Sequence, residues 1–208
     1  AVSSWTTNKG IDIFSKRIIF LPINESIHWS LCAVVNPGLI KNYFRITNKS
    51  SPYLKNLDSD GEEKFDCMNS EVPCIIFLDS LKAHPKNVVA ANVTIWLNHE
   101  WQKTKGDNDV FTRNSIKLFA PKVPYQNNTW DCGVFVCKYA FSLYQLRYQK
   151  ITYGELQQSK PLVNAITNNR LMNFNMTDIA AFREEMGKLV DNLSLVYLDE
   201  KNNCMLLG

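Results

Sequence analysis

The stretch that decides the interpretation of this chain reads Gln126-Asn127-Asn128-Thr129-Trp130-Asp131-Cys132-Gly133. An apolar pattern of helical spacing follows it and predicts a helix over residues 132–148, with Thr129 or Asp131 as the N-cap. A thiol at a helix N-terminus lies beside unpaired backbone N–H groups and the positive end of the helix dipole. Both favour the thiolate, which is the nucleophilic form of cysteine. The sequence therefore predicts that Cys132 is a nucleophile, the alternative being a buried cysteine at a helix start.

Three further residues have the chemistry that such a nucleophile requires. His28 opens a predicted strand and can act as the base, while Asp79 ends an apolar run and can orient that histidine. Gln126 can donate an amide hydrogen to a developing oxyanion, together with the backbone N–H of Cys132. Gly133 leaves room for a substrate backbone beside the cysteine. Each residue alone has a plainer structural explanation, but together they predict a cysteine protease.

The remaining histidines and cysteines are given no chemical role. His84 falls in a predicted loop and His99 near the end of a predicted helix, and both are predicted to lie at the surface. No Cys-x-x-Cys pair occurs, so we expect no zinc or redox motif and no metal. Cys32, Cys74 and Cys137 lie in apolar runs and are predicted to be core thiols. This cysteine usage is typical of a reducing compartment.

Length and composition indicate a globular domain and exclude several classes of function. The chain has 208 residues, of which 45% are hydrophobic and 21% charged, as expected for one domain with a sizeable core. A net charge of +3 without a dense basic run does not indicate nucleic acid. No apolar stretch approaches the roughly 18 residues that suggest a membrane span. We expect neither nucleic acid nor a membrane as a partner, and no cofactor.

Hydrophobic periodicity predicts an α+β domain. The predicted strands cover residues 17–23, 28–35, 74–79 and 116–120, and the predicted helices cover 87–103, 132–148 and a last segment from Thr177 or Asp178 to about Leu193. On that last helix five residues are predicted to face inward: Ile179, Phe182, Met186, Leu189 and Val190. Residues 41–70, rich in Asn, Ser, Lys and Asp, are interpreted as a surface insertion.

The order of these motifs along the chain resembles that of the SUMO-specific cysteine proteases, the Ulp/SENP family. The matching stretches are residues 5–6, 11–14, 19–24, 28–31, 77–81, 123–128, 131–136 and 174–186. The most specific of them is the block from Gln126 to Cys132. The resemblance implies a papain-like α+β fold, in which helices flank a mixed central sheet.

The resemblance also implies a reaction and a partner. It assigns His28 as the base, Asp79 as its orienting acid, Cys132 as the nucleophile and Gln126 as the oxyanion donor. In the family, the tryptophan after the histidine covers a narrow tunnel that holds the substrate's Gly-Gly tail, a role that falls here on Trp29, whose alternative is ordinary strand packing. The implied function is a thiol protease that cleaves after the C-terminal Gly-Gly of SUMO, chiefly to remove SUMO from target lysines.

Finer expectations follow from the same resemblance. The insertion and the N-terminal motifs are similar to the branch that trims poly-SUMO chains, and the nucleus is favoured over the cytoplasm. We expect residues 1–208 to form one catalytic domain, acting as a monomer and lacking the family's N-terminal portion. Two alternatives stay open. One is a protease for another ubiquitin-like modifier such as NEDD8, and the other is a module that binds a ubiquitin-like protein without cleaving it.

Overall fold

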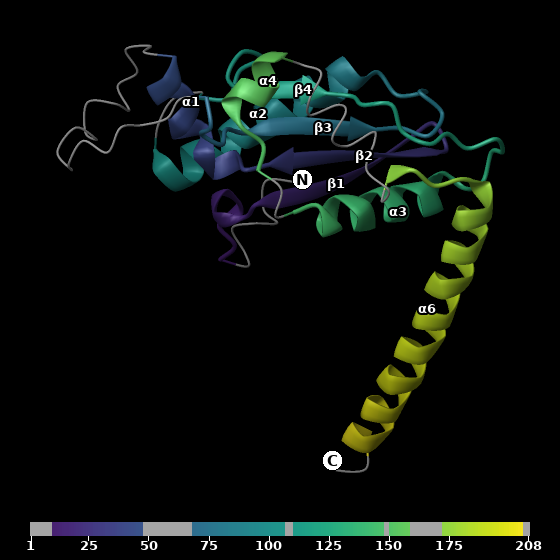
Figure 1. Ribbon diagram of the computed structural model, residues 1–208. Coiled ribbons are helices and arrows are strands. Elements are labelled where there is room, and N and C mark those ends of the chain that lie inside the picture. Colours follow the sequence, from purple (N-terminus) through teal and green to yellow (C-terminus); the bar gives the residue numbers. More distant parts are fainter. Residues whose placement is uncertain (1–9, 48–67, 107–109, 148–149, 159–171, 206–208) are drawn as a thin grey trace.

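A computed structural model describes residues 10–47, 68–106, 110–147, 150–158 and 172–205 (Figure 1). Two short 3-10 helices, η3 (Ile13–Ser15) and η4 (Pro37–Leu39), accompany the main elements. Those are, in chain order, β1 (Ile18–Glu25), β2 (His28–Val35), α1 (Ile40–Ile46), β3 (Cys74–Leu78), α2 (Lys86–Lys105), β4 (Lys117–Phe119), α3 (Cys132–Gln145), α4 (Tyr153–Gln158) and α6 (Met176–Met205). None of the helices in these ranges has the length and apolar character needed to cross a membrane.

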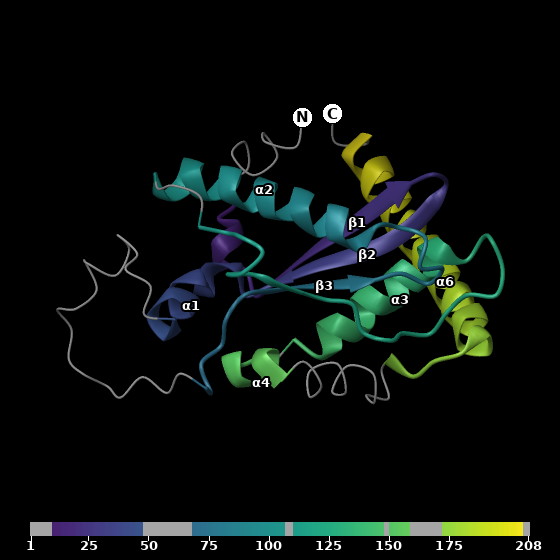
Figure 2. The ribbon, with the colours of Figure 1, turned by 90° about the horizontal axis from the view of Figure 1, so that it is seen from above.

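The centre of the fold is a mixed sheet in the order β1-β2-β3-β4. β1, β2 and β3 pair antiparallel, and β4 pairs parallel to β3. β3 is buried along its whole length and β2 at every residue except Trp29, because both carry near-continuous apolar runs. Figure 2 shows α2 on one side of the sheet and α3 on the other. The predicted α+β class, with helices flanking a mixed sheet, is confirmed.

The strand register brings two predicted site residues to the same end of the sheet. β2 and β3 are antiparallel, with Leu31 opposite Leu78. The start of β2, at His28, and the residue after β3, Asp79, therefore lie at the same end of these two neighbouring strands. α3 packs against β2, so the helix that begins with Cys132 covers this strand.

The predicted surface insertion begins differently from expectation. Its first residues belong to helix α1, in which Ile40 and Tyr43 are buried. These side chains are one helical turn apart and share the face that packs on the core. The amide of Asn42 also donates to the backbone carbonyl of Glu71, at 2.9 Å. Residues 48–67 of the insertion lie outside the described ranges.

The last helix is longer than predicted and is capped by a different residue. Asn175 Oδ1 accepts the N–H of Thr177 at 2.7 Å, and Asp178 Oδ2 accepts the N–H of Asn175 at 2.9 Å, so Asn175 is the cap in a capping box. The inward face was predicted correctly only for the first turns. Leu189 and Val190 are exposed, because α6 projects away from the sheet in its second half (Figure 1).

Candidate active site

Cys132 lies where the sequence predicted it, as the first residue of α3, and it is buried. Asp131 occupies the N-cap position but makes no capping hydrogen bond. Its carboxylate instead contacts the guanidinium of Arg183 from α6 and accepts from Asn128 Nδ2 at 2.6 Å. Burial alone would raise the pKa of Asp131, but the bonds from Arg183 and Asn128 hold it below its ordinary value. An ionised carboxylate thus ties the cysteine loop to α6.

The structure brings His28 and Asp79 into direct contact. His28 Nε2 lies 2.7 Å from Asp79 Oδ1, and both side chains are buried. The same carboxylate accepts three backbone N–H groups, from Leu81 at 2.9 Å, Lys82 at 3.0 Å and His84 at 2.9 Å. Burial would raise the pKa of Asp79, but the His84 N–H, the His28 ring and the Leu81 N–H lower it below its ordinary value.

This hydrogen bond determines which imidazole nitrogen of His28 carries the proton. An ionised carboxylate can only accept, so Nε2 carries the proton that points to Asp79. In the neutral ring Nδ1 then has the free lone pair. Nδ1 is buried and has no hydrogen-bond partner, a condition that it shares, among the described residues, with Trp96 Nε1 alone. A buried unpaired nitrogen is costly unless a reactant uses it.

Gln126 is fixed by bonds at both ends of its side chain. The amide oxygen accepts from Ser80 Oγ at 2.6 Å, and Nε2 donates to the carbonyl of Asn128 at 2.7 Å. The Gln126 backbone N–H also donates to the Ser80 carbonyl at 3.2 Å. One of the two Nε2 hydrogens is thus used inside the loop, and the other is left to donate. The nucleophile loop and the loop after Asp79 are joined by the pair Ser80–Gln126.

Exposed aromatic side chains adjoin three of these residues. Trp29 follows His28 and is 41% exposed, Tyr125 precedes Gln126 and is 43% exposed, and Trp130 lies two residues before Cys132 and is 71% exposed. Trp29 was predicted as a substrate contact, but Tyr125 and Trp130 were not. Their position beside site residues was the signal available in the sequence. A methyl group added at Gly133 would meet no atom within 4 Å, so the space next to the nucleophile is open.

His84 is the residue that the sequence prediction placed wrongly. It is buried, not at the surface, and its ring centroid is 4.8 Å from that of His28. Nδ1 lies 2.6 Å from Ser30 Oγ, and Nε2 lies 3.1 Å from the carbonyl oxygen of Glu25. A loop histidine before a proline has no periodicity that would reveal such contacts. His99 is exposed, as predicted.

Of the three cysteines besides Cys132 whose side chains are described, two are buried and one is exposed. Cys32 and Cys74 are core thiols, as predicted, and burial raises the pKa of each to about 12. Cys137 is exposed and corrects the prediction, since it lies on the face of α3 turned away from the sheet. Of the described side chains, only His28, Asp79 and His84 form a group that could hold a metal, with ligand atoms within 4.8 Å. The Asp79 carboxylate and both ring nitrogens of His84 already have hydrogen-bond partners, so we assign no ion to this group.

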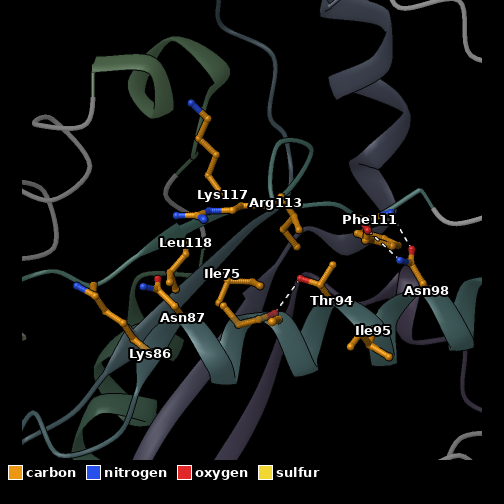
Figure 3. A pocket seen from close by; sticks show the side chains of 14 residues that line it. Ile75, Lys86, Asn87, Thr94, Ile95, Asn98, Phe111, Arg113, Lys117 and Leu118 are labelled. Carbon is orange, nitrogen blue, oxygen red and sulfur yellow. Dashed lines mark hydrogen bonds between the residues drawn. The ribbon is translucent and has the colours of Figure 1, made fainter.

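Of two cavities in the described part of the chain, one adjoins the candidate active site. One, of about 490 Å³, is bordered by Asp79, His84 and Tyr125, and so lies next to the carboxylate. The other, of about 690 Å³, lies between α2 and β4, where Lys86, Arg113 and Lys117 line it (Figure 3). Cys132 lines neither, and the larger cavity is separate from the candidate active site.

A mixed sheet that places a buried His–Asp pair at one end, with a cysteine at the start of a helix packed on the sheet, is the arrangement typical of papain-like cysteine peptidases. Residues 1–187 match the Ulp1 protease family, C-terminal catalytic domain, and the chain belongs to that family.

Individual relatives agree with this assignment. Sentrin-specific protease 7 of Mus musculus is 30% identical over 172 residues, which are 69% of this chain and 16% of the relative. The probable ubiquitin-like-specific protease 2B of Arabidopsis thaliana is 31% identical over 144 residues, 66% of this chain and 13% of the relative. A solved structure described as a de-sumoylating protease shares the fold, with a TM-score of 0.57 and 18% identity over 97% of this chain and 66% of that one.

Proposed function

We propose that this chain is the catalytic domain of a thiol protease that cleaves after the C-terminal Gly-Gly of SUMO, chiefly to release SUMO from target lysines. The observation that carries the proposal is the state of His28, whose Nε2 faces Asp79 while its Nδ1 is buried and unpaired. A free imidazole nitrogen in a site with a helix-terminal cysteine is what thiol activation requires. The chain spans about a sixth of the mouse relative's length, 16%, and that relative is named a sentrin-specific protease.

The proposed reaction is an acyl transfer in two steps. The Cys132 thiol gives its proton to His28 Nδ1, and the thiolate attacks the carbonyl carbon of the modifier's last glycine. The tetrahedral intermediate collapses as His28 returns the proton to the leaving lysine amine, which breaks the isopeptide bond and leaves a thioester. Water, deprotonated by the same imidazole, then hydrolyses the thioester and restores the thiol.

Asp79 and Gln126 contribute charge and geometry to these steps. The Asp79 carboxylate keeps the proton of His28 on Nε2 and stabilises the imidazolium that forms. Gln126 offers its second amide hydrogen to the oxyanion, beside the Cys132 N–H at the open start of α3. Because Ser80 fixes the amide oxygen, the donor is already oriented before the substrate arrives.

Substrate selection is proposed to rest on a narrow approach to the cysteine. Trp29 would cover the tail of the modifier, and the open space at Gly133 would admit its backbone. Only glycine residues pass such a gap, so side chains on the tail are excluded by their size. We propose SUMO and its conjugates as the partners, a monomeric enzyme, and the nucleus rather than the cytoplasm as its site of action. We also propose the branch that trims poly-SUMO chains, which rests on the resemblance of the insertion and of the N-terminal motifs.

An activity-based probe tests the proposal directly. SUMO with a C-terminal vinyl sulfone should form a covalent adduct with the wild-type chain and none with Cys132→Ser. Cys137→Ser is the matched control, since it removes an exposed thiol from the same helix and should leave labelling intact. If a NEDD8 probe labels the chain and the SUMO probe does not, the modifier that it cleaves is NEDD8 and not SUMO. A folded protein that no such probe labels would contradict the protease function itself.

A further inference from the structure

The turn that presents His28 is strained. β1 and β2 are joined by the two residues Ser26 and Ile27, with Glu25 paired opposite His28. Both turn residues have positive φ, 52° at Ser26 and 63° at Ile27. Such two-residue turns favour Asn and Gly, and a β-branched residue with positive φ is an outlier. Ile27 is also 96% exposed, so its side chain gains nothing from packing.

A strained backbone persists only where its surroundings hold it. His84 makes the contacts that can do so. Its Nε2 faces the carbonyl of Glu25, which can only accept, so Nε2 donates. Its Nδ1 then accepts from the hydroxyl of Ser30, which is fully buried. These two hydrogen bonds hold Glu25 and Ser30, which lie before and after the segment that contains His28 and Trp29.

His84 also joins this segment to the acid of the site. Its backbone N–H donates to Asp79 Oδ2 at 2.9 Å, while Asp79 Oδ1 faces His28. One residue therefore contacts the end of β1, the second residue beyond His28 in β2, and the loop after β3. Both of its ring nitrogens are engaged, so the ring has no atom left for proton transfer with a substrate.

We propose that His84 is a positioning residue, whose imidazole ties the strained Ser26–Ile27 turn to the Asp79 loop and so sets the orientation of His28 toward Cys132. The proposal rests on the proposed function, because it assigns His84 to the same reaction. It acts through His28 and does not touch the reacting atoms.

The test compares His84→Ala with His84→Gln and with His99→Ala. Glutamine keeps one donor and one acceptor at a similar reach, and His99 is an exposed histidine that serves as the matched control. Two quantities are measured for each: kcat and KM for a fluorogenic SUMO C-terminal substrate, and the pH profile of Cys132 alkylation by iodoacetamide, followed by mass spectrometry. A thermal melt of each variant establishes that it is folded.

We expect His84→Ala to lower kcat by about 10- to 100-fold, the effect of misplacing a reacting group by about an ångström. The pH profile of Cys132 alkylation should move with it, because the thiolate depends on a correctly placed imidazole. His84→Gln should recover most of both properties, and His99→Ala should match the wild type. A folded His84→Ala with wild-type kcat and alkylation profile overturns the proposal.

Two further outcomes are informative. If His84→Ala does not fold, Ser30→Ala takes its place, since it removes the hydroxyl that Nδ1 contacts and leaves the ring. A folded Ser30→Ala with wild-type kcat and a wild-type alkylation profile would then overturn the proposal. A wild-type chain that cleaves no SUMO substrate would contradict the proposed function alone, because the alkylation profiles still report on the His84 contact.

Discussion

At the scale of single residues, surroundings decide which thiols can react. The structure describes the side chains of four cysteines, which are chemically identical. Cys32 and Cys74 have no exposed surface, and burial raises the pKa of each to about 12. Cys137 lies in solvent, and Cys132 lies at a helix start with an open space beside Gly133. Reactivity therefore follows position in the fold.

Alkylation of the native protein measures this difference. Near neutral pH, we expect iodoacetamide to modify Cys132 and Cys137 and to spare Cys32 and Cys74, because a thiol with a pKa of about 12 is almost wholly protonated there. Peptide mass spectrometry after a short reaction gives the extent at each site. Equal modification of Cys32 or Cys74 in the folded protein would show that the sheet opens on the time scale of the reaction.

The proposed oxyanion donor can be tested with a side chain of the same size. Gln126→Glu keeps an acceptor for Ser80 Oγ but removes both amide hydrogens, the free one and the one bonded to the Asn128 carbonyl. We expect kcat for SUMO cleavage to fall by about 10²- to 10³-fold, the usual effect of losing one such donor. KM should change little, since the donor acts on the transition state. A variant with an unchanged melting temperature and a wild-type kcat would exclude Gln126 from the oxyanion site.

At the scale of elements, α6 combines an anchored first half with a projecting second half. Ile179 is fully buried, and Phe182 and Met186 pack against the core. Arg183 contacts Asp131, the residue before Cys132. Between Leu189 and Leu198 its apolar side chains are exposed. The anchored half thus holds the cysteine loop, and we expect the two halves to respond differently to substitution.

Urea unfolding separates these two halves. Arg183→Met removes the ionic partner of a buried carboxylate and should lower the free energy of unfolding by about 1 kcal/mol, a modest loss because the guanidinium is half exposed. Leu193→Ser, in the exposed half, should change it by less than about 0.5 kcal/mol. The same loss from both substitutions would mean that the projecting half is packed against something in solution.

Sequence patterns predicted the elements whose apolar period is strong. β2, β3, α2 and α3 were predicted from continuous or helical apolar spacing, and their observed bounds differ by a few residues at most. α1 was missed because seven residues within an Asn- and Lys-rich stretch carry too short a period. The exposed half of α6 was misjudged because a helical pattern shows which residues share a face and not whether anything covers it.

The candidate site was predictable to the extent that its residues lie next to recognisable motifs. The contact between His28 and Asp79 followed from their places at strand ends. His84 could not be found this way, since its partners Glu25 and Ser30 are brought to it only by the hairpin and the loop after β3. Contacts between segments distant in sequence leave no local pattern.

At the scale of the whole molecule, two buried carboxylates couple stability to pH. Asp79 and Asp131 both have pKa values below their ordinary value of 3.8 in the folded chain. The unfolded chain therefore binds protons more readily than the folded chain in this range. The stabilisation is complete above the ordinary value and is lost as pH falls through the lower, folded value.

Because both pKa values are lowered in the folded chain, acid should destabilise it. We expect the free energy of unfolding to fall steeply as pH drops below about 4, the ordinary range of an aspartate. Asp131→Asn should be less stable than the wild type at neutral pH but should lose less on acidification, because one of the two linked groups is gone. Urea titrations over a series of pH values give both quantities. Parallel acid limbs for the two proteins would contradict the assignment of Asp131.

The three groups of the site also have an order in time. His28 and Asp79 are 51 residues apart and meet through the pairing of β2 with β3, and Cys132 follows them at the start of α3. During synthesis from the N-terminus, the proposed base and acid emerge first and can come together before Cys132 has been added to the chain. Cys132, the proposed nucleophile, is the last of the three to leave the ribosome. On the proposed mechanism, a growing chain therefore gains its nucleophile only after both strands that position the proposed base and acid have been synthesised.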